Sequence, residues 1–260
     1  MHNHQYQQPP DFHLVIPCYE ESSRLPSYLC DLILLLREKE YSTNILIVDD
    51  GSNRQERARL KEIISELGKT SDLIMDPLYL EKNMGKGYAV RAGWQTGRSA
   101  KWLAFVDADG ATPACEVIRI FDTVYQNNDS NRCYMGSRIR MLGRSVERHW
   151  KRHVVGRMYA TLVGIVINEA IYDSQCGFKI IPGQAFAAIS NVLSENRFAF
   201  DSELIAALSD AGYCLEETPV DWKDIPGSKV SIIKDSTRMV KSLFLIQTRR
   251  KNWTFSNKGN

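Results

Sequence analysis

Two aspartates separated by one residue, Asp107 and Asp109, are the side chains of this sequence whose chemistry is easiest to recognise. They follow the apolar run 102–106, which is typical of a buried β-strand, and α/β folds place reactive groups at the carboxyl ends of their strands. Paired carboxylates hold hard cations such as Mg²⁺ or Mn²⁺, usually together with substrate phosphates. The alternative is that an aspartate here only caps the next helix. The spacing favours a metal site at Asp107 and Asp109.

Three further polar clusters follow apolar runs in the first half of the chain. They are Pro17–Glu21, Asp49–Ser52 and Asn83–Gly87. In the third cluster, glycines would let backbone amides approach an anion, and Lys86 supplies a positive charge. Each cluster alone is compatible with an ordinary turn. A nucleotide with a divalent cation would use all four clusters, because it needs acceptors for a base or ribose, donors for phosphates and carboxylates for the metal.

The composition is that of a globular protein with a substantial core. Of the 260 residues, 43% are hydrophobic, and 33 basic residues nearly balance 31 acidic ones, so the net charge indicates no particular partner. The six cysteines show no close pair at metal-finger or redox spacing, which favours a reduced, cytoplasmic location. The longest apolar run, 158–167, is shorter than the roughly 20 residues that cross a bilayer. We therefore expect no membrane-spanning segment.

Alternating strand and helix patterns place the polar clusters at strand ends. Strands are predicted at 13–17, 44–48, 73–75, 101–106, 132–136, 176–181 and 214–220. Helices are predicted at 26–39, from the second cluster to 67, and at 87–97, 147–167, 200–211 and 232–247. The β-α-β-α order of the first half predicts an α/β fold with a mainly parallel sheet and helices on both faces. A single domain is expected over residues 12–252, between a disordered tail at 1–11 and a second tail at 253–260.

The order of these motifs resembles the inverting family 2 glycosyltransferases of the GT-A fold, in particular those that transfer sugars to dolichyl phosphate. The resemblance runs from about residue 12 to residue 250. The matching motifs are Pro17-Cys18-Tyr19 with Arg24-Leu25-Pro26, Val48–Ser52, Asn83–Gly87, Asp107–Thr112, Gly136–Arg138, Asp173–Lys179, Phe200–Leu204 and Trp222–Lys229. At Glu20 the family usually has Asn, which leaves Glu21 as the match.

The resemblance implies a role for each matching residue. Residues 12–130 would bind a nucleotide sugar and residues 131–252 its acceptor. The donor-binding residues would be Pro17, Tyr19, Glu21, Asp49, Asp50, Asn83, Lys86, Asp107, Ala108 and Lys229. Asp107 and Asp109 would hold Mg²⁺ or Mn²⁺ on the diphosphate. Ser137, Arg138 and Gln175 would meet an acceptor phosphate.

The expected reaction is the inverting transfer of a hexose, most closely glucose from UDP-glucose, to a polyprenyl phosphate. A lipid phosphate is already anionic at neutral pH, so it needs positioning by Arg138 more than it needs a base. A sugar hydroxyl would need a general base, and Asp173 and Asp201 are the candidates. Asp201 could equally be the N-cap of the helix that it begins. A GDP-mannose donor and a soluble glycan acceptor remain open as alternatives.

Two basic segments predict contact with an anionic membrane surface. Arg144, Arg148 and Arg152 recur every fourth residue, so a helix would align them. The predicted helix 232–247 combines an apolar face with basic residues and is followed by the basic run 249–251 and Trp253. Such helices suit the surface of an anionic bilayer, although both segments could instead be solvated faces of core-packing helices. No nucleic-acid motif accompanies the charge, so we expect peripheral membrane association and no nucleic-acid partner.

Other functions fit fewer of these features. The Asp107-x-Asp109-Gly110 sequence also resembles the aspartyl nucleophile motif of haloacid-dehalogenase-type phosphatases, but that motif normally lies near the start of a domain. A nucleotidyltransferase would carry a glycine-rich, arginine-bearing N-terminal loop, and a NAD-dependent oxidoreductase a Gly-x-Gly-x-x-Gly motif after its first strand. A non-catalytic nucleotide-sugar-binding protein is the remaining alternative.

Overall fold

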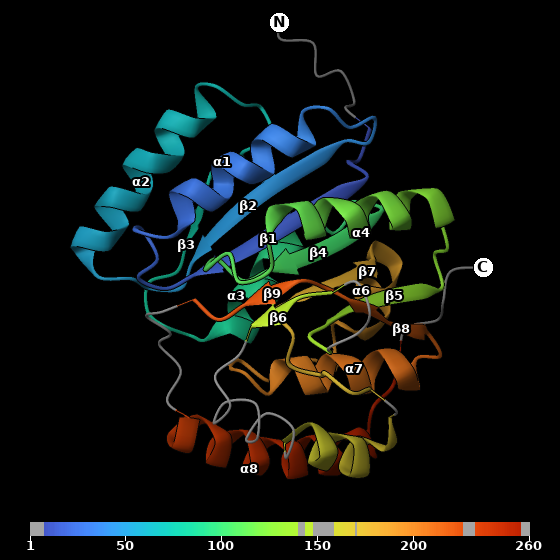
Figure 1. Ribbon diagram of the computed structural model, residues 1–260. Helices are drawn as coiled ribbons and strands as arrows, with labels where there is room; N and C mark the ends of the chain where they lie inside the picture. Colours follow the sequence, from blue (N-terminus) through green and yellow to red (C-terminus); the bar gives the residue numbers. More distant parts are fainter. Residues whose placement is uncertain (1–7, 140–143, 148–158, 170, 226–231, 256–260) are drawn as a thin grey trace, which may run out of the picture.

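The computed structural model describes residues 8–139, 144–147, 159–169, 171–225 and 232–255. A seven-stranded sheet in the order β3-β2-β1-β4-β7-β5-β8 forms its centre (Figure 1). Its strands are β1 (Phe12–Cys18), β2 (Thr43–Asp49), β3 (Leu78–Tyr79), β4 (Trp102–Val106), β5 (Arg132–Ser137), β7 (Phe178–Pro182) and β8 (Cys214–Pro219). A separate two-stranded sheet pairs β6 (Val146–Glu147) with β9 (Trp222–Lys223).

The strand directions bring the polar clusters to one edge of the sheet. β1 is parallel to both β2 and β4, and Cys18 lies opposite Asp49 at the carboxyl end of the β1–β2 pair. β7 runs antiparallel to β4 and β5, with Val106 opposite Phe178. The loop that precedes β7 therefore meets the loops that follow β1, β2 and β4. The predicted mainly parallel sheet is confirmed, with β7 as an antiparallel strand inside it.

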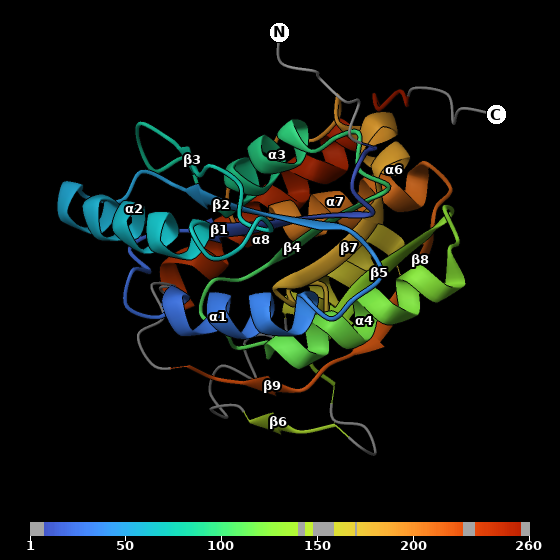
Figure 2. The same cartoon turned by 90° about the horizontal axis from the view of Figure 1, so that it is seen from above.

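Helices cover both faces of the sheet, as predicted (Figure 2). The helices α1 (Leu25–Leu36), α2 (Arg54–Gly68) and α4 (Ala114–Asn127) lie on one face, and α3 (Lys86–Thr96), α6 (Gly183–Ile189) and α7 (Phe200–Asp210) on the other. Successive residues of a strand point to opposite faces. Accordingly, Leu14 and Ile16 of β1 join the first core, whereas Val15 joins the second.

A third layer packs against α7. It consists of α8 (Ile232–Arg250), the helical residues 159–163 and the π-helical turn η1 (Gly164–Asn168), which lie together below α7 in Figure 1. Leu243, Val163 and Ile167 form its small core with Ala206 of α7. Trp253, within the segment expected to be a tail, packs against this layer and the second core. Across the residues that the structure describes, no helix has the length and apolar character to cross a membrane.

Two predicted elements differ from the structure. Residues 73–75 make only a bridge between Ile74 and Ile45, and the edge strand β3 lies at Leu78–Tyr79 instead. The predicted helix 147–167 does not begin at its first residue, because Glu147 belongs to β6 and pairs with β9.

The predicted alignment of Arg144 with Arg148 and Arg152 on one helix is also wrong. Arg144 precedes β6 rather than lying in a helix, and its Nη1 is 2.7 Å from the carboxylate of Glu116 on α4. That buried carboxylate fixes Arg144 against the domain. Arg148 and Arg152 lie outside the described residues.

Candidate active site

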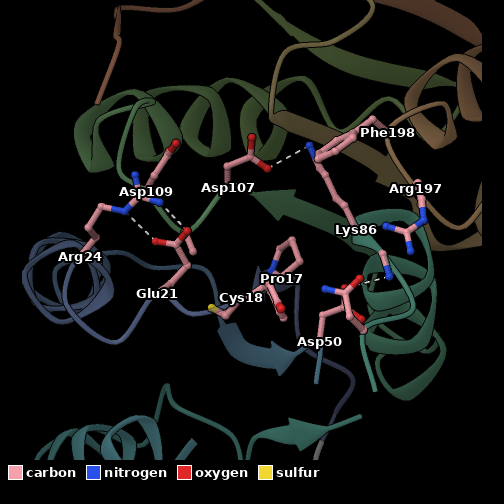
Figure 3. A pocket seen from close by; sticks show the side chains of 14 residues that line it. Pro17, Cys18, Glu21, Arg24, Asp50, Lys86, Asp107, Asp109, Arg197 and Phe198 are labelled. Atoms are coloured by element: carbon pink, nitrogen blue, oxygen red, sulfur yellow. Dashed lines mark hydrogen bonds and ion pairs between the residues drawn. The ribbon is translucent and has the colours of Figure 1, made fainter. Parts of the chain in front are cut away.

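A pocket of about 500 Å³ opens at the carboxyl edge of the sheet (Figure 3). Its walls come from the segments after β1, β2 and β4, the start of α3, and the segment before α7. The predicted residues that line it are Pro17, Tyr19, Glu21, Asp50, Asn83, Lys86, Asp107, Ala108 and Asp109. The structure therefore brings all four polar clusters of the sequence to one volume.

The acid pair begins directly after β4. The backbone N–H of Asp107 donates to the carbonyl of Gly177 at 2.9 Å, and a Cβ on Gly177 would overlap the carboxylate of Asp107. This close approach explains a glycine at that point of the Asp173–Lys179 motif. Asp109 accepts a hydrogen bond from the N–H of Ala111 at 3.0 Å. Burial, with the charge of Asp107 as a second cause, raises the pKa of Asp109 above its usual value.

The donor chemistry of this pair fits a divalent cation. Two crowded carboxylates disfavour each other's charge, and a cation between them would remove that penalty. Within the described residues, no group of three or more His, Cys, Asp or Glu side chains is arranged to hold a metal ion. The chain would therefore supply Asp107 and Asp109, and diphosphate oxygens and water would complete the shell, as is usual for Mg²⁺.

A buried row of alternating charges runs from Asp107 away from the pocket. Lys86 Nζ lies 2.9 Å from Asp107 and 3.6 Å from Asp201, and Asp201 lies 2.5 Å from Lys179 Nζ. Burial alone would lower the pKa of Lys86, but the charges of Asp107 and Asp201 raise it above its usual value. Lys179 also donates to the carbonyls of Ser174 and Cys176. Lys86 is thus held as a cation at the pocket wall.

Asp201 is part of this row rather than part of the pocket wall. Its side chain is buried, and both of its oxygens face lysines. The alternative that Asp201 caps its helix is wrong, because α7 begins at Phe200 and its N-cap residue is Ala199. A catalytic role for Asp201 as a base stays a prediction.

The two acids at the carboxyl end of β2, Asp49 and Asp50, make different contacts. Asp49 is buried, accepts from Arg57 Nε at 2.9 Å and from the N–H of Ser52 at 3.3 Å, and does not line the pocket. Asp50 faces the pocket and accepts from the backbone N–H groups of Met84 and Gly85 at 2.7 and 2.8 Å. The anion that these two amides contact is therefore the carboxylate of Asp50.

Glu21 and Arg24 form an ion pair on the side of the pocket near Asp109 (Figure 3). Arg24 Nε donates to Glu21 Oε2 at 2.7 Å, and the carbonyl of Glu21 accepts from the N–H groups of Arg24 and Leu25 at the start of α1. Because Glu21 is bound to Arg24, we expect any contact of Glu21 with a donor to involve both side chains.

Two of the three residues predicted to meet an acceptor phosphate, Ser137 and Arg138, form a network with Asp173 and Glu217 beside the pocket. Arg138 donates to Asp173 from its backbone N–H, Nε and Nη2 at 2.7, 2.8 and 2.8 Å. Glu217 accepts from Ser137 Oγ and from the N–H of Asp173, which fixes the Asp173 segment to β8. Burial opposes the charge of Arg138, but the carboxylates of Asp173 and Asp107 raise its pKa.

Gln175 does not line this pocket. Gln175 Nε2 donates to Ser202 Oγ at 3.3 Å, which ties the Asp173–Lys179 segment to α7. Lys229 lies outside the described residues. The roles predicted for Gln175 and Lys229 in substrate binding stay predictions.

Arg197 and Phe198 line the pocket and were not predicted from the sequence. They belong to the segment before α7, and Figure 3 shows Arg197 beside Asp50 and Phe198 in front of Lys86. The only signal in the sequence is their position directly before the Phe200–Leu204 motif. Arg24 and Cys18 also line the pocket; both lie in the first matching motif, which assigned them no role.

A family model described as Glycosyl transferase family 2 matches residues 13–189. The chain belongs to glycosyl transferase family 2. This glycosyltransferase is 32% identical over 245 residues to the dolichyl-phosphate beta-glucosyltransferase of Dictyostelium discoideum, covering 91% of this chain and 73% of that one. It is 31% identical over 258 residues to the enzyme of the same name from Saccharomyces cerevisiae, covering 95% and 77%. The alternatives of a phosphatase and a non-catalytic protein are therefore wrong.

Solved structures of this glycosyltransferase fold support the architecture. Glucosyl-3-phosphoglycerate synthase from Mycobacterium tuberculosis, in complex with Mn²⁺, UDP and phosphoglyceric acid, matches with a TM-score of 0.65 at 12% identity, over 93% of this chain and 78% of that one. Mannosyl-3-phosphoglycerate synthase from Rubrobacter xylanophilus matches with a TM-score of 0.66 at 14% identity, over 93% and 74%. At these identities the likeness concerns the fold alone, and it confirms the predicted single GT-A-type domain.

Proposed function

We propose that this glycosyltransferase transfers glucose from UDP-glucose to a dolichyl or other polyprenyl phosphate, with Mg²⁺ or Mn²⁺ as cofactor. The observation that carries the proposal is the pocket itself, in which the acid pair, Lys86 and Asp50 border one volume of about 500 Å³. That volume lies within the range of roughly 300–1,000 Å³ that is usual for small-molecule sites. The dolichyl-phosphate beta-glucosyltransferases that the chain is similar to support glucose as the sugar and dolichyl phosphate as the acceptor, and the Mn²⁺ and UDP of the mycobacterial neighbour support the metal and the nucleotide.

The residues divide the pocket into two ends. The end formed by Asp50, Asn83 and Arg197 would take the nucleoside, and the end formed by Lys86 and the acid pair would take the diphosphate. A bound divalent cation would supply Lewis-acid neutralisation of the charge that the departing diphosphate gains. Lys86, kept protonated by its two carboxylate neighbours, adds a positive charge fixed in place before the reaction.

The acceptor would be positioned by the Arg138 network. A guanidinium binds a carboxylate or a phosphate in the same bidentate geometry, so an acceptor phosphate would exchange for Asp173 on Arg138. Attack by its oxygen from the side opposite the diphosphate would invert the anomeric carbon. This acceptor needs no general base; a base at Asp173 or Asp201 would be required only for a hydroxyl acceptor.

The proposal includes peripheral association with the cytosolic face of an anionic membrane, where a polyprenyl phosphate would reside. On α8, Phe244 and Leu245 expose more than half of their side chains, and Ile165 of η1 is 73% exposed. Arg238 and Lys241 of α8 are also exposed. Apolar side chains with neighbouring cations are the combination that binds anionic bilayers.

A radiolabelled donor assay tests the function directly. The protein is incubated with Mg²⁺, a polyprenyl phosphate and either UDP-[¹⁴C]glucose or GDP-[¹⁴C]mannose, and the products are partitioned between organic and aqueous phases. We expect label from UDP-glucose in the organic phase, dependent on the lipid. Label transferred from GDP-mannose alone would overturn the proposal of UDP-glucose as donor. Label in a water-soluble glycan would overturn the proposal of a lipid phosphate as acceptor.

A further inference from the structure

Residues 194–199 form a short segment directly before α7, here called the wall segment. It supplies Arg197 and Phe198 to the active-site pocket. A segment without regular hydrogen bonding needs other contacts to hold it in one conformation. Those contacts come from α3 on one side and from a buried carboxylate of α7 on the other.

The contacts with α3 fix the middle of the wall segment. The N–H of Tyr88 donates to the carbonyl of Asn196 at 3.1 Å, and Arg91 donates to the Asn196 side chain and, at 2.5 Å, to the carbonyl of Leu193. A Cβ on Gly87 would overlap the Cβ of Phe200 and crowd the carbonyl of Glu195. The second glycine of the Asn83–Gly87 motif thus lets the wall segment pack closely on the start of α3.

The contacts with α7 converge on Glu203, whose side chain is fully buried. Its Oε2 accepts from the N–H groups of Ser194 and Glu195 at 2.8 and 2.7 Å, and its Oε1 accepts from Ser194 Oγ at 3.0 Å. Arg249 of α8 lies 3.3 Å from Oε1 and also pairs with Glu195. A buried carboxylate is costly unless it is hydrogen-bonded. Moving the start of the wall segment away would remove three of those hydrogen bonds.

Glu203 does not line the pocket, so it can reach a substrate only through the residues that it holds. We propose that Glu203 is a positioning residue for donor binding, which sets the wall segment so that Arg197 and Phe198 face the nucleotide sugar. The inference rests on the proposed function in one respect, namely that this pocket is the donor site. It adds a separate role for the second acid of the Phe200-Asp201-x-Glu203 motif.

The test compares steady-state kinetics of Glu203→Gln with those of the wild type. The glutamine keeps the shape of the side chain, but its –NH₂ group cannot accept from Ser194 and repels Arg249. We expect the KM for the donor to rise about tenfold while kcat at saturating donor and the KM for the acceptor change less than about threefold. A merely destabilised protein would instead lose kcat, through fewer active molecules, at an unchanged KM.

Two further variants make the comparison specific. Asp210→Asn removes an ion pair between α7 and α8, that of Asp210 with Arg250, which does not contact the wall segment; it should leave the donor KM unchanged. Arg197→Ala should raise the donor KM, and adding Glu203→Gln to it should raise the KM by much less than the product of the two single effects. Full multiplicativity, or a loss confined to kcat, would overturn the inference.

If Glu203→Gln proves too unstable to purify, Ser194→Ala replaces it, because it removes only the Ser194 Oγ hydrogen bond. Its donor KM should rise about twofold to threefold, and an unchanged KM would overturn the inference. All variants are assayed with whichever of UDP-glucose and GDP-mannose the wild type uses. A wild type that uses GDP-mannose would overturn the proposed donor while leaving the Glu203 comparison intact.

Discussion

At the scale of single residues, the acids around this site differ in how many hydrogen bonds from the protein stabilise their charge. The carboxylate of Asp50 is bound by two backbone amides, that of Asp173 by Arg138, and that of Glu203 by the wall segment. Asp109 differs, since burial and the charge of Asp107 raise its pKa despite the hydrogen bond from the N–H of Ala111 and the charge of Arg24. A charge-crowded carboxylate on a pocket wall is a typical ligand-binding group.

The variant Asp109→Asn should therefore lose transfer activity without losing its fold. We expect kcat to fall by about 100-fold or more, since removing one group that stabilises a developing charge commonly costs that much. The melting temperature should stay the same or rise slightly, because the substitution removes a like-charge contact with Asp107. Labelled-donor turnover, Mn²⁺ binding by electron paramagnetic resonance and a thermal melt measure the three effects.

Asp129→Asn is the matched control for this variant, since Asp129 is an aspartate in the loop between α4 and β5 and does not line the pocket. It should retain full activity and Mn²⁺ binding. Unchanged activity of Asp109→Asn, or of the wild type in excess chelator, would contradict the metal site.

Much of the site could be predicted because strand ends of a parallel sheet meet at one edge. The same reasoning could not separate Asp49 from Asp50, because neighbouring residues at a strand end face opposite ways and either could face the pocket. It also missed Arg197 and Phe198. They follow no strand, and their place depends on contacts of the wall segment with α3, which is distant in sequence, and with the buried carboxylate of Glu203.

At the scale of elements, local sequence patterns predicted the central strands, but they did not predict the direction of β7 or the existence of β6 and β9. The apolar run of β7 is the same whichever way the strand runs, so its antiparallel direction was not readable from it. The two-residue strands β6 and β9 have no periodicity to detect. By contrast, α4 has helical spacing in Val117, Phe121 and Val124, all buried, and could have been predicted.

His13 of β1 makes the sheet–helix contact sensitive to acid. Its ring is fully buried, Nε2 contacts the carbonyl of Gly93 on α3 at 3.1 Å, and burial lowers its pKa. Below the ordinary histidine pKa of about 6.5 the unfolded chain therefore binds a proton that the folded protein does not. The free energy of unfolding should therefore show no loss from His13 above that pH, and it should fall as the pH drops towards the lower pKa of the folded state.

The variant His13→Gln can still donate to Gly93 but does not titrate, so it should lose less stability on acidification than the wild type. Thermal melts of both proteins at pH 7.5 and pH 5.5 measure the difference, and all other titrating groups cancel in the comparison. Equal losses in the two proteins would show that His13 does not cause the acid sensitivity.

At the scale of the whole molecule, α8 carries the proposed membrane-binding surface and also contacts a residue that supports the active-site pocket. One side of α8 packs on α7 through Leu243, and Arg249 near its end contacts Glu203 beneath the wall segment. The other side exposes Phe244 and Leu245. Leu245 lines a groove together with residues 194–199, so a bilayer that bound this side would lie beside the segment that shapes the donor pocket.

The double variant Phe244→Ser/Leu245→Ser should weaken binding to vesicles of phosphatidylserine and phosphatidylcholine by about tenfold or more. Burial of a large apolar side chain contributes about 1.5–3 kcal/mol, and each basic side chain near an anionic surface adds about 1 kcal/mol. Flotation at low and high salt measures both contributions.

Leu34→Ser is the matched control, because Leu34 on α1 is 64% exposed but lies apart from α8. This variant should float with the vesicles like the wild type. Two results would show that α8 is not the membrane-binding surface. The wild type would fail to bind anionic vesicles at low salt, or Leu34→Ser would lose as much binding as the double variant.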